Sequence, residues 1–167
     1  EGHYKVHGTI KKTASSPGNT INDWNEFEVR LTQLECVNES EWDRGSNSDE
    51  PFVMALLVPL PGGIQKYCTA PFGDVDDGEK PGMNITFAKV RVSKTNGVIS
   101  VPVCVMESDD ESNNDRLECL SKFAGEAEKK TDAARKEFTA ALGASLAEDW
   151  KVASLNIYCF KRGTDIH

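Results

Sequence analysis

The chain has 167 residues and a formal net charge of -8. This length fits one domain, residues 1–167, that buries a continuous core of its own. A protein this acidic, in which Lys and Arg do not cluster, is not expected to bind nucleic acid, and no window approaches the ~18 consecutive apolar residues of a transmembrane helix.

Alternating apolar and polar residues predict strands in the first part of the chain. Residues 4–10 alternate, and residues 14–23 are rich in Ser, Pro and Gly, which is typical of a loop. From residue 24 to residue 37 the alternation resumes but changes phase between Leu31 and Leu34. A β-bulge, or a break between two strands, would produce this change.

The centre of the chain predicts a fully buried strand and a hairpin. Residues 52–60 are almost wholly apolar and are bracketed by prolines, which favours a strand buried on both faces. A short segment around Tyr67 follows. Residues 87–106 predict a β-hairpin, because Asn96 and Gly97 accept the positive φ angles of a tight reversal.

Residues 115–148 are alanine-rich and predict helical structure. Leu120, Phe123, Ala124 and Ala127 have the spacing of one apolar helix face. The pair Thr131-Asp132 can cap a second helix, so one long helix and a helical hairpin both stay open. We expect this face to pack on a sheet rather than enter a membrane, because alanine buries little area.

These elements together predict a mainly β fold. The expected architecture is an antiparallel β-sandwich with the alanine-rich helical insertion before a last strand at 152–160. The alternative is an α+β sheet backed by helices on one face. A parallel βαβ organisation is disfavoured, because only one connection is long enough to be a crossover helix.

Several features favour a secreted protein. The chain begins at Glu1 without a methionine, as it would after removal of a signal peptide. Two N-glycosylation sequons are present, Asn38-Glu39-Ser40 and Asn84-Ile85-Thr86. The five cysteines form no C-x-x-C pair, so they predict up to two disulfides and one leftover thiol rather than a zinc ribbon; those in strands can equally be small buried apolar residues. They are Cys36, Cys68, Cys104, Cys119 and Cys159.

Carboxylates concentrate in three segments, 48–51, 73–79 and 107–111, each beside a predicted strand. Such a density of negative charge is unfavourable unless water or a cation neutralises it. Calcium takes ~6–8 oxygen ligands, and loops at one end of a sandwich can supply them from distant sequence positions. The candidate calcium ligands are Asp49, Asp74, Asp76, Asp77, Glu107, Asp109 and Asp115.

The same residues have other possible roles. An EF-hand is excluded, because with Asp74 as first ligand Gly78 comes one place early and Ile85 replaces the bidentate glutamate. Solvated acidic loops that only keep the protein soluble are the alternative. An acid pair such as Asp74 and Glu107 would suit glycoside hydrolysis, but no aromatic-lined cleft is evident, and we expect a protein that is not an enzyme.

Three short segments carry a resemblance to known domains. Ser48-Asp49-Glu50-Pro51-Phe52-Val53 resembles the Ser-Asp-Pro-Tyr-Val segment of calcium-dependent C2-type domains, with one extra residue. Residues 101–109, followed by Asn114-Asp115, are similar to their strand and acidic loop. Residues 73–79 resemble a loop of secreted microbial sandwich modules. The resemblance spans residues 27–117 and implies a sandwich with a cation site at one end, while the alanine-rich region and the cysteines depart from C2-type domains.

The sequence therefore predicts a secreted, non-enzymatic, calcium-binding β-sandwich module whose partner is an extracellular protein or glycan. The alternative function is a secreted effector or toxin that acts on a target cell through the amphipathic region 117–146.

Overall fold

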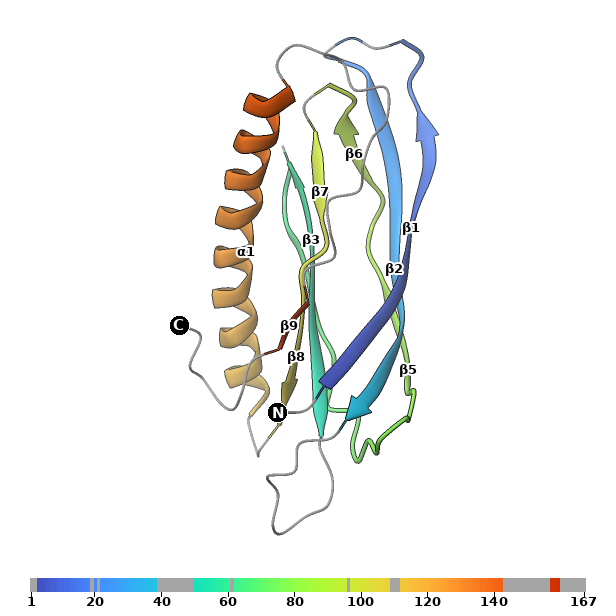
Figure 1. Ribbon diagram of the computed structural model, residues 1–167, viewed down its shortest axis with the longest axis vertical. Helices are drawn as coiled ribbons and strands as arrows, with labels where there is room; N and C mark the ends of the chain where they lie inside the picture. Colours follow the sequence, from blue (N-terminus) through green and yellow to red (C-terminus); the bar gives the residue numbers. More distant parts are fainter. Residues whose placement is uncertain are drawn as a thin grey trace.

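The fold is that of a computed structural model, which describes residues 3–18, 20, 22–38, 50–60, 62–95, 97–108, 112–142 and 157–159. In this part of the chain two β-sheets pack face to face, and a long helix covers the outer face of the second sheet (Figure 1). The predicted mainly β fold, an antiparallel sandwich with a helix before the last strand, is therefore confirmed.

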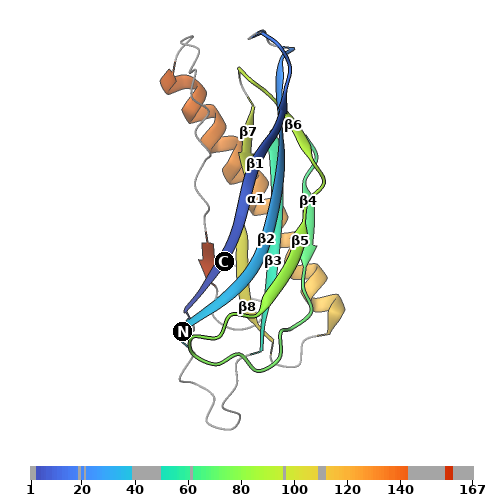
Figure 2. The same ribbon diagram turned by 90° about the vertical axis from the view of Figure 1, so that its right-hand side faces the viewer.

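The first sheet is built around its longest strand, β2 (Trp24–Asn38). The other strands, all antiparallel to β2, are β1 (His3–Ser15), β5 (Gly82–Thr86) and β6 (Val90–Ser93). β5 and β6 follow one another along β2, and between them the Phe87 N–H donates to the Val29 carbonyl oxygen at 3.1 Å. Figure 2 shows this sheet in front, with the helix behind it.

The second sheet is built around β3 (Pro51–Leu60). Its other strands are β4 (Gln65–Cys68), β7 (Val98–Ser100), β8 (Val103–Glu107) and β9 (Ile157–Cys159). β7 and β8 pair with β3 in one continuous register, and between them the Leu56 N–H donates to the Pro102 carbonyl oxygen at 2.9 Å. β9 lies parallel to β8, so the helix before it is the crossover of one parallel pair.

β3 is buried on both faces, as its apolar sequence predicts. Residues such as Val53, Ala55 and Leu57 point into the core between the sheets. The alternate residues, among them Leu56 and Val58, pack under the helix. One strand therefore belongs to both hydrophobic layers, which explains why it lacks polar positions.

The phase change in β2 is a β-bulge within one strand, which is the first of the two predicted alternatives; β2 is not broken into two strands. His7 pairs with Gln33 and Gly8 pairs with Leu31, which leaves Thr32 as the extra residue. Gly8 fits here because a Cβ atom at this position would overlap the Arg30 carbonyl oxygen and lie 2.7 Å from the Leu31 side chain. Leu31 and Leu34 both remain buried on either side of the bulge.

The predicted hairpin over residues 87–106 is wrong, although the reversal at Gly97 is present. The Gly97 N–H donates to the Ser93 carbonyl oxygen at 3.1 Å. However, β6 pairs with β2 in the first sheet, whereas β7 pairs with β3 in the second. The turn therefore carries the chain from one sheet to the other.

α1 (Asn113–Leu142) is one continuous helix, so the alternative of a helical hairpin is not observed. Its predicted apolar face packs on the second sheet, where Leu120, Phe123, Ala124 and Ala127 are buried. Thr131 does not cap a second helix: it is buried within α1, and its Oγ1 donates to the Ala127 carbonyl oxygen at 2.7 Å. Among the described residues, no helix has the length and apolarity that crossing a bilayer requires.

No disulfide joins the four cysteines whose side chains the structure describes, Cys36, Cys68, Cys104 and Cys119. Cys36 and Cys104 are fully buried within strands β2 and β8. They therefore fit the alternative interpretation of cysteine as a small buried apolar residue. The side chain of Cys159 lies outside the described residues.

Candidate functional site

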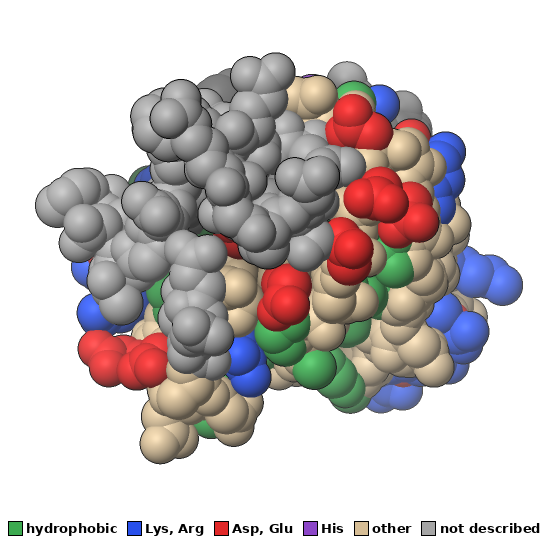
Figure 3. All heavy atoms as spheres, turned by 90° about the horizontal axis from the view of Figure 1, so that it is seen from below, with side chains coloured by type: hydrophobic (Ala, Val, Ile, Leu, Met, Phe, Trp, Pro, Cys, Tyr) green, Lys and Arg blue, Asp and Glu red, His purple; other side chains and the backbone are tan. Residues whose placement is uncertain are grey.

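The described carboxylates of the three acidic segments lie at one end of the sandwich, the lower end in Figure 1. We call this region the acidic end. It comprises the connection 69–81 between β4 and β5, Glu50 and Glu107 at the ends of β3 and β8, and Asp115 at the start of α1. Figure 3 shows acidic side chains in a row across this end. The strand connections that carry the described carboxylates therefore lie at the same end of the sandwich.

The connection 69–81 is anchored to both sheets through its backbone. Where it leaves the second sheet, the Phe72 N–H donates to the Pro51 carbonyl oxygen at 2.9 Å. Where it reaches the first sheet, the Gly78 N–H donates to the Cys36 carbonyl oxygen at 2.9 Å, and the Cys36 N–H donates to the Glu79 carbonyl oxygen at 3.0 Å. The connection therefore closes the lower end of the sandwich.

Val75 fixes which side chains of this connection face the solvent. It is 2% exposed and packs in the core between the sheets. Its neighbours Asp74 and Asp76 are exposed. A tight turn follows, in which the Glu79 N–H donates to the Asp76 carbonyl oxygen at 3.0 Å and Gly78 has a φ of 82°. Positive φ at the third position of such a turn is the reason for glycine there.

Five of the predicted calcium ligands can be placed, and two cannot. Asp74, Asp76 and Asp77 are exposed in the connection 69–81, Glu107 is partly buried at the end of β8, and Asp115 is exposed in the first turn of α1. Asp49 and Asp109 lie outside the described residues. In the described part of the chain, no three His, Cys, Asp or Glu side chains are close enough together to hold a metal ion.

Asp115 also has a local structural role. Its Oδ2 accepts from the Ser112 N–H at 3.1 Å and from the Ser112 hydroxyl at 2.7 Å, while the Asp115 N–H donates to the Ser112 Oγ at 3.3 Å. This reciprocal pair is a capping box at the start of α1. A cation bound to Asp115 would compete with the cap for the same carboxylate.

Lys80, in the connection 69–81, pairs with Glu35 of β2 and so ties the acidic end to the first sheet. The Lys80 Nζ is 3.1 Å from Glu35 Oε1, and the His7 Nε2 is 2.6 Å from Glu35 Oε2. The hydrogen bonds from His7 and then from Lys80 hold the pKa of Glu35 below its usual value. Both oxygens of the Glu35 carboxylate therefore already contact protein groups.

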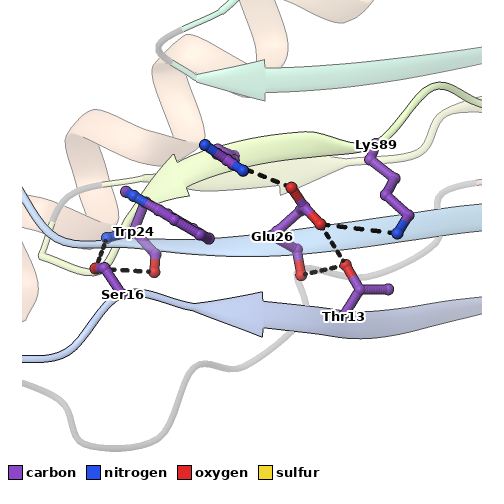
Figure 4. A network of polar contacts seen from close by, with 6 residues as sticks. Thr13, Ser16, Trp24, Glu26 and Lys89 are labelled. Atoms are coloured by element: carbon purple, nitrogen blue, oxygen red, sulfur yellow. Dashed lines mark hydrogen bonds and ion pairs between the residues drawn. The ribbon is translucent and has the colours of Figure 1, made fainter.

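The outer face of the first sheet carries a second polar network (Figure 4). Glu26 accepts from the Thr13 hydroxyl at 2.9 Å and from the Arg91 Nε at 3.0 Å, and Lys89 lies 3.8 Å away. The Arg91 guanidinium also stacks 4.0 Å above the Trp24 ring. Arg91 therefore covers one face of this tryptophan and links β6 to Glu26 of β2 on the sheet surface.

Sequence reasoning missed these contacts for different reasons. The Ser112 and Asp115 pair has the Ser-x-x-acid spacing of a capping box, so a local signal was present. The contacts of Glu26 with Arg91 and of Glu35 with Lys80 join residues 65 and 45 positions apart, and no local pattern marks them. They follow only from the pairing of strands.

Comparison of the chain with known proteins finds no matching family model, no matching curated protein and no matching solved structure.

Proposed function

We propose that this protein is a non-enzymatic extracellular binding module whose acidic end binds calcium and contacts a protein or glycan partner. The observation that carries the proposal is the placement of Asp74, Asp76, Asp77 and Glu107 at one end of the sandwich. Calcium accepts carboxylate, carbonyl and water oxygens at flexible geometry, so it suits a site that loops assemble.

The anchoring of the connection 69–81 supports this role. Backbone hydrogen bonds to both sheets and the buried Val75 hold the exposed carboxylates on a rigid frame. Further ligands would come from Asp49 and Asp109, which neighbour Glu50 and Ser108 in the sequence. Glu50 and Ser108 meet at the acidic end, where the Ser108 N–H donates to the Glu50 carbonyl oxygen at 3.1 Å.

Thermal unfolding in calcium and in chelator tests the proposal. A ligand at 100 times its dissociation constant stabilises the folded state by about 2.7 kcal/mol, which corresponds to roughly 5–10 °C for a chain of this size. We expect calcium to raise Tm by this order, and magnesium at equal ionic strength to raise it less. Partner binding, assayed on extracellular proteins and glycans, should weaken in chelator.

A matched pair of variants assigns the site. The triple variant Asp74→Asn, Asp76→Asn and Asp77→Asn should lose the calcium-induced shift, because an amide is a weaker ligand than a carboxylate. Glu128→Gln removes an exposed carboxylate on α1 and should keep the shift. An equal shift in all three proteins would show that the connection 69–81 does not bind the ion.

The alternative function, an effector or toxin that acts through the amphipathic helix, would require α1 to leave the sheet. Leu120, Phe123 and Ala124 are buried at that interface, so undocking would expose apolar surface on both partners. Dye release from vesicles by the intact protein would favour this alternative. Vesicles that stay sealed at micromolar protein would favour the binding module.

A further inference from the structure

The sequon Asn84-Ile85-Thr86 lies in β5 with the side-chain orientation that a glycan requires. Asn84 and Thr86 are exposed on the outer face of the first sheet, whereas Ile85 between them is 4% exposed and packs in the sandwich core. The acceptor amide and the hydroxyl therefore both face solvent. A bulky group on Asn84 would displace no core residue.

β5 also lies at an edge of its sheet, where it pairs with β2 on one side. An edge strand exposes backbone groups that can pair with another chain, and proteins commonly cover such edges. We call the line along which the edges of β4 and β5 approach each other the seam. Just past the end of β5, Gln65 of β4 bridges it: the Gln65 side chain accepts from the Ala88 N–H at 2.8 Å and donates to the Ala88 carbonyl oxygen at 3.0 Å. Asn84 lies on the same edge strand, four residues before Ala88 along the chain.

An exposed aromatic side chain lies at the same seam. Tyr67 of β4 reaches across to β5, where its hydroxyl donates to the Thr86 carbonyl oxygen at 3.3 Å, and its ring packs edge-on against Phe87 at 5.3 Å. Even so, Tyr67 is 41% exposed, and it is one of the few large apolar side chains of the described residues with such exposure. The apolar face of a sugar ring is a suitable cover for it.

We propose that Asn84 is an N-glycosylation site and that its glycan covers Tyr67 and the β5 edge. In the reaction the Asn84 side-chain nitrogen bonds to the anomeric carbon of a lipid-linked oligosaccharide and loses a proton. The bond from that carbon to the lipid pyrophosphate breaks, and the lipid pyrophosphate leaves. This inference rests on the extracellular location in the proposed function, because the modification takes place on the secretory route.

The test is expression through the secretory pathway of a eukaryotic host, with intact mass and peptide mapping as readouts. We expect a glycan on Asn84 that peptide:N-glycosidase removes, with conversion of the acceptor to aspartate. Asn84→Gln and Thr86→Val should abolish the modification, and Thr86→Ser, which keeps the sequon hydroxyl, should retain it. All three changes are at exposed positions. Unmodified Asn84 in the secreted protein, while a co-expressed glycoprotein is modified, would overturn the proposal.

Nitration of Tyr67 tests the shielding. The glycosylated protein should be nitrated at Tyr67 several-fold more slowly than the same protein after enzymatic removal of the glycan, and equal rates would refute the cover. The calcium-induced Tm shift of Asn84→Gln separates this inference from the proposed function. Asn84 is not among the proposed calcium ligands, so the shift should persist without the glycan.

Discussion

Leu56 and Leu57 offer a direct comparison of the two hydrophobic layers. They are neighbours in β3, both are fully buried, and they point to opposite faces of the same strand. Leu57 packs between the two sheets, and Leu56 packs under α1. Replacement of each by alanine removes the same three carbon atoms, so any difference in cost comes from the surroundings.

The two costs can be worked from burial. Loss of three buried carbon atoms costs about 2.4 kcal/mol in transfer free energy at roughly 0.8 kcal/mol per carbon. A cavity that cannot collapse adds up to about 2 kcal/mol. Between the sheets the strands are fixed by hydrogen-bonded ladders, so we expect about 4 kcal/mol for Leu57→Ala. Under α1 the helix can settle toward the sheet, so we expect about 2–3 kcal/mol for Leu56→Ala.

Urea unfolding gives the two free energies, and native-state hydrogen exchange shows where each change acts. Leu56→Ala should reduce protection of the α1 amides more than that of the β2 amides, whereas Leu57→Ala should reduce both. A cost below about 1 kcal/mol for Leu56→Ala, with unchanged protection of α1, would refute the packing of the helix on this face.

Three further outcomes follow from the described contacts. Gly8→Ala should destabilise the protein by about 1–3 kcal/mol in urea unfolding, because the new Cβ would overlap the backbone opposite the bulge; a neutral effect would contradict that geometry. The pKa of Glu35 is lowered in the folded state, so its contribution to stability is present above its usual pKa of 4.5 and is lost as the pH falls through the lower folded value. Glu35→Gln should therefore flatten the acid limb of a plot of unfolding free energy against pH. An unchanged acid limb would exclude this role. Cys68 is partly exposed, so it should be the first of the described cysteines to react with a thiol reagent in the folded state. Its rate should keep rising above pH 9, because burial raises the pKa of this thiol. Earlier reaction of the buried Cys104 would contradict this order.

The sequence predicted best those features that one segment determines alone. The unbroken apolar run of β3 required burial on both faces, and the structure supplies a core on each side. The phase change between Leu31 and Leu34 fits an extra residue in β2, and the pairing with β1 places it at Thr32. In both cases the pattern follows from the side-chain period of two, which decides which residues of a strand can face a core.

The predicted hairpin failed because turn chemistry does not choose the partner of a strand. Asn-Gly favours a reversal, and the hydrogen bond from Gly97 to Ser93 shows that the chain does turn there. Whether the flanking strands then pair with each other depends on which other edges are open. β2 and β3 are long strands with open edges, so β6 and β7 pair with them and lie in opposite sheets.

The location of the acidic end follows from the direction of successive strands. β1 to β4 alternate in direction; β5 with β6 form the fifth pass along the sandwich, and β7 with β8 the sixth. The acidic segments follow the second, fourth and sixth passes, so their flanking residues must meet at one end. The spacing of the carboxylates has a different origin. Because Val75 points into the core, Asp74 and Asp76 must point to solvent on either side of it. Strand direction therefore brings the acidic segments to one end of the sandwich. The inward-facing Val75 separates Asp74 from Asp76 at that end, so a shared cation would need ligands from more than one connection.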